Sequence, residues 1–170
     1  MIRIDLKSIN STNLYAKEIA ENTNDNIVIV SEEQTAGCGT KGKNWYSDKD
    51  SIICSFLIKN RNKTIPLDYS YRIGIIVSNI INKRCNVDTY VKKPNDIYLN
   101  EKKLGGILIE TQYVSTKLDY IIIGIGLNVN QKSMPEDIIK IATSLCMETG
   151  SKYNKEDIIS ELIKEIENIE

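Results

Sequence analysis

One segment of the chain, from Gln34 to Trp45, combines three glycines, two lysines and the only tryptophan in the sequence QTAGCGTKGKNW. Successive backbone N–H groups in a glycine-rich loop can form a nest for an anion, and lysine adds a point charge suited to phosphate. The spacing matches neither GxxxxGK[ST] nor GxGxxG before a helix, so it predicts neither a P-loop nor a Rossmann site. An anion-binding loop and a solvated basic surface loop are both compatible with these residues.

Two further segments place charged side chains beside strand-like runs. In VKKPND, Asp96 ends a Pro-Asn-Asp turn, and in KKLGGILIE, Lys103 precedes Gly105 and Gly106 by a few residues. A carboxylate near lysine could hold Mg²⁺ beside a nucleotide phosphate, although Pro, Asn and Asp are also ordinary turn residues. The glycine pair predicts a surface over which a ligand lies flat, with the Lys103 ammonium at its end.

A third group of glycines, Gly124 and Gly126, lies in the strand-like run GIGLNVN, which continues to Asn128 and Asn130. Seven of the nine glycines fall in these three places. Glycine weakens a strand interior unless a bulge, a bend or the close approach of another group requires it. We therefore expect the three places to line one cavity, the alternative for GIGLNVN being a core strand with capping amides.

Alternating and helical apolar spacing predicts the elements that position these residues. Ser11, Thr12 and Asn13 offer N-caps to the first helix, and a tight turn is expected around Asn100 to Lys102. The expected strands are 1–7, 26–32, 51–58, 87–92, 96–100, 103–112 and 118–128, and the expected helices are 14–20, 66–85, 135–142 and 154–169. Clustered consecutive strands predict an α+β fold, with a mixed, mostly antiparallel sheet flanked by helices, in one domain over residues 1–170.

Composition excludes several classes of function. The net charge is −1, so bulk electrostatics do not favour nucleic acid. The longest apolar run, Tyr120 to Leu127, is far shorter than a membrane span, and no signal peptide is recognisable, so a cytoplasmic location is expected. The chain has no histidine and its four cysteines form no CxxC pair. Zinc sites and Ser-His-Asp or Cys-His catalysis are therefore not expected.

Taken together and in order, five motifs make the chain resemble the catalytic domain of biotin–protein ligases. They are Ser11–Asn13 (STN), Gln34–Trp45, Pro94–Asp96 (PND), Lys103–Glu110 (KxGGILxE) and Gly124–Asn130 (GIGxNVN). The resemblance implies a class II synthetase-like fold. It also implies ATP-dependent activation of biotin to biotinyl-5'-AMP, and transfer to a lysine of a biotin carboxyl carrier protein domain. ATP and Mg²⁺ are the implied cofactors, and a homodimer is a possible assembly.

The resemblance also implies roles for individual residues. Lys103 would bridge the substrate carboxylate and the phosphate, and Mg²⁺ would lie near Asp96. Trp45 would pack on the ligand or the closed loop, the alternative being ordinary core packing. The implied catalytic residues are Lys103, Asp96, Lys41 and Lys43; the implied nucleotide-binding residues are Asn95, Asn128 and Asn130; and the implied substrate-binding residues are Ser11, Thr12, Asn13, Gln34, Gly37, Cys38, Gly39, Thr40, Trp45, Gly105 and Gly106.

The chain also departs from the family pattern. Cys38, Thr40, Lys41 and Lys43 stand where arginines are typical, so the two-pronged guanidinium contacts are lost. Three interpretations follow: a biotin ligase with reduced or relaxed activity, a lipoyl- or octanoyl-type enzyme acting on another carboxylate, or a non-catalytic carboxylate- or adenylate-binding homologue. Compared with other members, we expect neither an N-terminal DNA-binding domain nor a C-terminal β-barrel domain.

Overall fold

The computed structural model describes residues 1–59 and 64–169 of the chain, which form a seven-stranded sheet flanked by helices. The strands are β1 (Ile2–Ile9), β2 (Ile27–Gln34), β3 (Ser51–Lys59), β4 (Tyr90–Lys92), β5 (Asp96–Leu99), β6 (Lys102–Val114) and β7 (Lys117–Asn128). Their order is β1-β2-β3-β7-β6-β5-β4, with β1 and β2 parallel and the other pairs antiparallel. The predicted α+β class with a mixed, mostly antiparallel sheet is confirmed.

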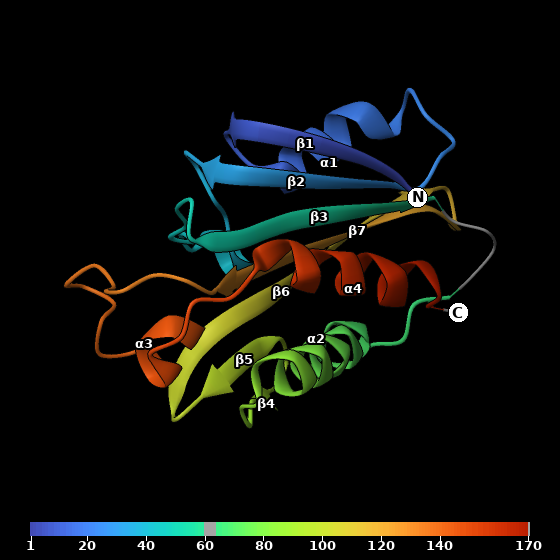
Figure 1. The fold of residues 1–170 in the computed structure, drawn as a ribbon. Helices are drawn as coiled ribbons and strands as arrows, with labels where there is room; N and C mark the ends of the chain where they lie inside the picture. Colours follow the sequence, from blue (N-terminus) through green and yellow to red (C-terminus); the bar gives the residue numbers. More distant parts are fainter. Residues whose placement is uncertain (60–63, 170) are drawn as a thin grey trace.

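The helices lie on both faces of the sheet (Figure 1). They are α1 (Thr12–Ala20), α2 (Tyr69–Cys85), α3 (Leu145–Thr149) and α4 (Lys155–Glu167), with one 3-10 turn, η1 (Thr40–Gly42). The larger hydrophobic core joins α2 and α4 to one face, and a smaller cluster joins α1 to the other. The central strands β3 and β7 are nearly continuous apolar runs because helices cover both of their faces.

Local sequence signals account for most boundaries. Asn154 caps α4 by accepting a hydrogen bond from the Glu156 N–H at 3.1 Å, as its position predicts. Asn100 and Glu101 both have positive φ, 48° and 64°, so the turn between β5 and β6 is the tight hairpin that the sequence predicts. A hairpin this short fixes the register of β6 and hence the position of Lys103 at its start.

Three sequence-based predictions of helices and strands are wrong. No helix forms over 135–142; turns occupy this segment, Ile139 and Ile141 are exposed, and Ala142 pairs with Lys103 of β6 instead. The helix predicted from Pro66 begins at Tyr69, after a turn in which the Tyr69 N–H donates to the Pro66 carbonyl.

The third error concerns the strand predicted over 87–92, which is confined to β4. Here the Thr89 N–H donates to the Asn82 side chain of α2 at 2.8 Å, and the Thr89 carbonyl accepts from the side chains of Ser78 and Asn82. Side chains of a helix therefore satisfy the backbone groups that a longer strand would have paired within the sheet.

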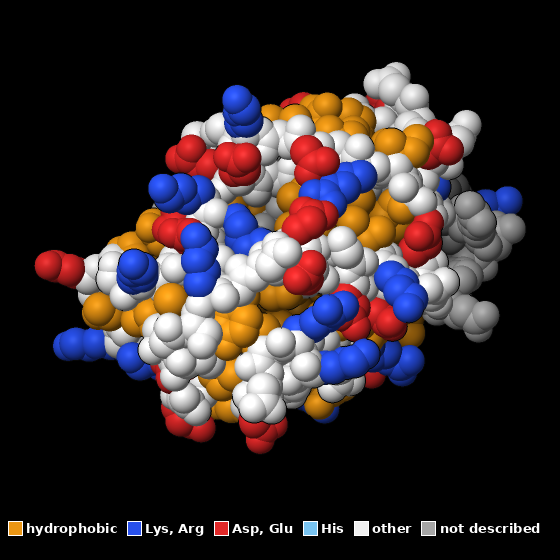
Figure 2. All heavy atoms as spheres, in the orientation of Figure 1, with side chains coloured by type: hydrophobic (Ala, Val, Ile, Leu, Met, Phe, Trp, Pro, Cys, Tyr) orange, Lys and Arg blue, Asp and Glu red, His pale blue; other side chains and the backbone are white. Residues whose placement is uncertain are grey.

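The face of the molecule seen in Figure 2 carries lysine, arginine and acidic side chains interspersed with one another. Some of the charged side chains of the protein are paired, since Arg3 contacts both Asp5 and Glu156. Among the described residues, no helix is both long enough and apolar enough to cross a membrane.

Neighbouring glycines in β6 provide a test of the packing. A Cβ on Gly105 would lie 2.5 Å from Leu127 Cδ2 and 2.7 Å from the Gly126 carbonyl oxygen. We expect Gly105→Ala to lower the free energy of unfolding by about 1–3 kcal/mol, measured by urea denaturation. Gly106→Ala is the matched control, since its nearest neighbour would be an ordinary contact at 3.5 Å. Equal losses in the two variants would contradict this account.

Candidate functional site

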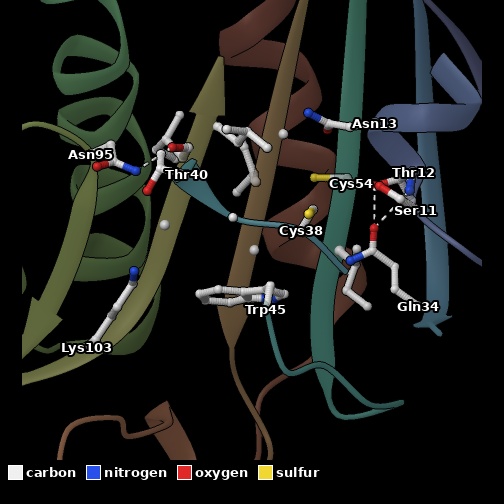
Figure 3. A pocket seen from close by; sticks show the side chains of 18 residues that line it. Ser11, Thr12, Asn13, Gln34, Cys38, Thr40, Trp45, Cys54, Asn95 and Lys103 are labelled. Carbon is white, nitrogen blue, oxygen red and sulfur yellow. Dashed lines mark hydrogen bonds between the residues drawn. The ribbon is translucent and has the colours of Figure 1, made fainter. Parts of the chain in front are cut away.

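The candidate site is a cavity on the α1 face of the sheet, over the middle of β3, β7 and β6. Its empty space is about 490 Å³, a figure that includes space open to solvent. The strand register places two rows of residues across its floor: Gly124 and Leu108, then Ile53, Gly126 and Gly106. Ser55 pairs with Gly124 but is fully buried and does not line the cavity. Figure 3 shows the walls, with Ser11, Thr12, Asn13 and Gln34 on one side and Asn95 and Lys103 on the other.

The glycines of β7 leave room for two protein side chains. A Cβ on Gly124 would lie 2.4 Å from Asn13 Oδ1, and a Cβ on Gly126 would lie 2.6 Å from the Trp45 ring. The sequence-based expectation that the glycines line one cavity holds for Gly39, Gly106, Gly124 and Gly126. The approach of Asn13 and Trp45 explains the spacing of Gly124 and Gly126 without the need for a ligand.

One end of the cavity is a neutral hydrogen-bonding network. Gln34 Oε1 accepts from the Thr12 backbone N–H at 2.8 Å and from the Thr12 hydroxyl at 3.1 Å. The Ser55 hydroxyl lies 2.7 Å from the Thr12 hydroxyl and 2.5 Å from Asn13 Oδ1. The Ser11 side chain makes no capping bond, so Gln34, from β2, takes the place of the expected local N-cap of α1.

The other end carries the cation. Lys103 Nζ lies 2.7 Å from Asp96 Oδ1 and 5.6 Å from the centre of the Trp45 ring, so the ammonium has both an ion pair and a cation–π contact. Both side chains of the ion pair are about one-third exposed, at 32% and 29%. Asn95, which is buried, holds the wall by donating to the Ile107 carbonyl at 2.8 Å. The cavity thus has a neutral polar end and a charged end.

The backbone of Lys103 is held from outside the sheet. Its N–H donates to the Ile141 carbonyl and its carbonyl accepts from the Thr143 N–H, each at 2.9 Å. Glu148, on α3, accepts from the Thr143 hydroxyl at 2.5 Å and from the Asn100 amide at 2.7 Å. These two hydrogen bonds, with that from Thr143 the stronger cause, hold the pKa of Glu148 below its ordinary value. Ile141, which accepts from the Lys103 N–H, lies in the segment over 135–142 for which the sequence predicts a helix.

The glycine-rich loop contributes part of one wall. Cys38, Gly39 and Thr40 line the cavity, and the loop closes on itself through a hydrogen bond from the Gly39 N–H to the Lys43 carbonyl at 2.7 Å. Lys43 is exposed and does not line the cavity. The expectation for the Lys41 side chain lies outside what the structure describes.

Several predicted site residues lie elsewhere. Asn130 is bound at both ends of its amide to the backbone of Tyr153, and Asn128 donates to the Thr143 carbonyl at 3.0 Å. Gly37, within the loop, and Gly105, within β6, are both buried. These four residues do not line the cavity, and the two asparagines instead tie the chain after β7 to neighbouring segments.

Cys54 lines the cavity, although the sequence did not single it out. Burial raises the pKa of its thiol to about 12, so the thiol stays protonated and is a poor nucleophile. Ser55 was also missed, because a serine within an apolar run carries no signal until the register places it against Asn13.

Asp96 fits a metal only in a limited way. Its carboxylate is paired with Lys103, and the described residues contain no group of three or more cysteines, aspartates or glutamates arranged to hold an ion. Mg²⁺ commonly takes one or two protein carboxylates and completes its shell with phosphates and water. The residues present therefore fit an ion that arrives with a nucleotide.

Comparison with known proteins agrees with this geometry. Residues 6–128 match the model of the family described as the biotin/lipoate A/B protein ligase family. A biotin protein ligase from Aquifex aeolicus, solved in complex with biotin and ATP, is 32% identical with a TM-score of 0.84, covering 98% of this chain and 68% of that one.

Two curated relatives extend the comparison. The bifunctional ligase/repressor BirA of Bacillus spizizenii is 35% identical over 91% of this chain and 49% of its own length. The biotin–[acetyl-CoA-carboxylase] ligase of Mycobacterium tuberculosis is 31% identical over 84% of this chain and 53% of its own length. The chain thus spans about half the length of these relatives.

The hydrogen bonds to Glu148 predict a pH-dependent contribution to stability. Because they lower its folded pKa, the stabilisation is complete above the ordinary value of 4.5 and is lost as pH falls through the folded pKa. We expect Glu148→Gln to lower the free energy of unfolding by about 1 kcal/mol at pH 7 and by less in acid. Urea unfolding across pH, with exposed Glu136→Gln as control, measures this. A difference that stayed constant with pH would argue against it.

Proposed function

The chain belongs to the biotin/lipoate A/B protein ligase family, and on that premise we propose that it activates biotin with ATP and passes it to a lysine of a carboxyl carrier domain. The observation that carries the proposal is the division of one cavity into two ends. The neutral network of Thr12, Asn13 and Gln34 suits the urea ring of biotin, which offers both donors and an acceptor. Lys103, at the other end, suits the carboxylate and a phosphate.

The proposed chemistry begins with attack of the biotin carboxylate on the α-phosphorus of ATP. The bond to the β-phosphate breaks, pyrophosphate leaves and biotinyl-5'-AMP remains. The amine of the carrier lysine then attacks the acyl carbon, and AMP leaves with the electron pair of the broken C–O bond. Lys103 would neutralise charge as it develops on the phosphate, in a site already oriented by Asp96 and Trp45. ATP would bring Mg²⁺ to the Asp96 side.

The proposal favours biotin over lipoate because of the neutral end. A dithiolane ring has no hydrogen-bonding groups, so it would cover the polar groups of Thr12 and Asn13 without pairing their remaining donors and acceptors. Sites built to pair with polar substrate atoms reject analogues that lack them. Calorimetric titration with biotin and with lipoate distinguishes the two substrates.

Removal of the Lys103 charge tests the activation step. We expect Lys103→Met to slow ATP–pyrophosphate exchange in the presence of biotin by roughly 30- to 900-fold, the equivalent of about 2–4 kcal/mol of barrier, while the fold is retained. Lys102→Met is the matched control, because adjacent residues of a strand point to opposite faces. Equal rates for Lys103→Met and the unaltered protein would show that the Lys103 charge takes no part in the activation step.

Cys38 and Thr40 stand where arginines are typical of the family, so we expect this protein to retain the adenylate less tightly than a ligase with arginines at these positions. Cys38 and Thr40 line the cavity without a positive charge, and a charge-assisted hydrogen bond is worth about 1.5–3 kcal/mol. We expect the unaltered protein to release biotinyl-5'-AMP and to label a bystander lysine-rich protein, and we expect Cys38→Arg/Thr40→Arg to reduce that labelling by roughly ten- to a hundredfold.

Streptavidin blots of the bystander after incubation with biotin and Mg-ATP measure this release. Cys38→Ser/Thr40→Ser is the control, because it changes the same positions without adding charge. Equal labelling by the arginine and serine variants would show that charge at these positions does not govern release.

A further inference from the structure

The charged end of the cavity contains an acidic side chain as well as a cation. The strand register puts Asp96 in one row with Gly106, Gly126 and Ile53, the row that crosses the cavity floor. The ion pair between Asp96 and Lys103 lies beside Gly106, since a Cβ there would be 3.6 Å from Lys103 Nζ and 3.7 Å from Asp96 Oδ1. Lys103 lines the cavity, whereas Asp96 is not among its lining residues. The Asp96 carboxylate is therefore bound to the cation that borders the ligand space.

Lys103 is the residue that pairs with Asp96. Lys103 Nζ lies 2.7 Å from Asp96 Oδ1. Lys92 stands opposite Asp96 on β4, but its ammonium lies over the Tyr98 ring, 5.0 Å from the ring centre. Within the part of the chain that the structure describes, Asp96 forms no other ion pair. The charge of Asp96 thus acts directly on Lys103, the residue proposed to receive the ligand carboxylate.

A ligand carboxylate bound to Lys103 would meet Asp96 at short range. A hydrogen bond from an ammonium to an oxygen spans about 2.7–3.2 Å. Because Asp96 Oδ1 lies 2.7 Å from the same nitrogen, the ligand oxygen could be at most about 6 Å from Asp96 Oδ1. Two negative charges at that distance repel each other, and a ligand that takes the place of Asp96 must break the ion pair instead. In either arrangement, Asp96 opposes the binding of a carboxylate more than that of a neutral ligand.

We propose that Asp96 competes with the substrate carboxylate for Lys103, and that a divalent cation arriving with the nucleotide relieves this competition by binding Asp96. The inference rests on the proposed function, because it takes the ligand to be biotin with its carboxylate at this end. Mg²⁺ binds one or two protein carboxylates together with phosphates. Once Asp96 is bound to such an ion, its charge no longer offsets that of Lys103. Recognition of the carboxylate is thereby coupled to binding of the nucleotide with its metal ion.

Isothermal titration of the full chain with biotin and with biotinamide, its uncharged primary amide, tests the competition. The ratio of the two affinities isolates the carboxylate, because the two ligands share their rings and aliphatic chain. Without nucleotide, we expect Asp96→Asn to raise the preference for biotin over biotinamide about three- to fivefold, the size expected from a partly exposed ion pair. Asp96→Ala, which also removes the oxygen that contacts Lys103, should raise the preference at least as much.

Glu101→Gln is the matched control for the loss of one negative charge. Glu101 is exposed and lies in the turn between β5 and β6, near the same end of the sheet. Salt screens exposed charges that make no direct contact, so this variant should change the preference by less than about twofold. Urea unfolding of each variant verifies that the fold is retained, as expected for an Asp96 side chain that is 29% exposed.

A second titration tests the coupling to the nucleotide. It uses Mg²⁺ with α,β-methylene-ATP, in which carbon replaces the oxygen of the bond that breaks, so binding is measured without reaction. We expect this complex to raise the preference for biotin over biotinamide about three- to fivefold more in the unaltered protein than in Asp96→Asn. Only the unaltered protein has an acidic competitor at position 96 from which Lys103 can be released.

The possible results distinguish the proposed function from the role of Asp96. Failure of the unaltered protein to bind biotin would overturn the proposed function. If biotin binds, an unchanged preference in Asp96→Asn, or an equal rise in Glu101→Gln, would overturn the competition and leave the proposed function intact. Equal responses of the unaltered protein and Asp96→Asn to the nucleotide complex would overturn the coupling. A rise confined to the Asp96 variants, with a smaller response to the nucleotide complex, supports both parts of the proposal.

Discussion

The close approach of two side chains to the central strand β7 is the constraint on which the site depends. Asn13 and Trp45 reach the backbone of the sheet only because Gly124 and Gly126 have no Cβ atoms. Two residues along a strand span roughly 7 Å, so the two side chains meet β7 at points about that far apart. The cavity therefore has two distinct ends because of where side chains are missing.

The charged end is arranged so that its cation can change partners. The ion pair between Lys103 and Asp96 is partly exposed, and exposed pairs are typically worth about 0–1 kcal/mol. Replacing Asp96 by a phosphate would therefore cost Lys103 little. The backbone of Lys103 is by contrast held at both its N–H and its carbonyl by the segment that precedes α3. The strand position is thus secured while the ammonium remains available.

The neutral end is held by a network of hydrogen bonds and not by one exchangeable ion pair. Gln34, Thr12, Ser55 and Asn13 contact one another through hydrogen bonds, and Asn13 also donates to Glu110. A hydrogen-bonded network of buried groups is rigid and costly to leave half-paired. Ligand recognition at this end would rest on preorganisation, whereas binding at the charged end would rest on exchange of one ion partner for another.

The sequence by itself determined the fold class, the order of the strands along the chain and the segments that meet at the cavity. Periodicity and turn residues are local signals, and they predicted the β5–β6 hairpin and the cap of α4 correctly. Five motifs in family order are sufficient to indicate the ligase family.

Only the tertiary structure decided what the glycines, asparagines and hidden polar residues do. Asn130 binds the Tyr153 backbone and not the cavity, and the segment over 135–142 forms turns that lead into a pairing with Lys103. Asn13 donates a hydrogen bond to Glu110, 97 residues away in sequence. These outcomes depend on register and on contacts between distant segments, which local spacing does not encode.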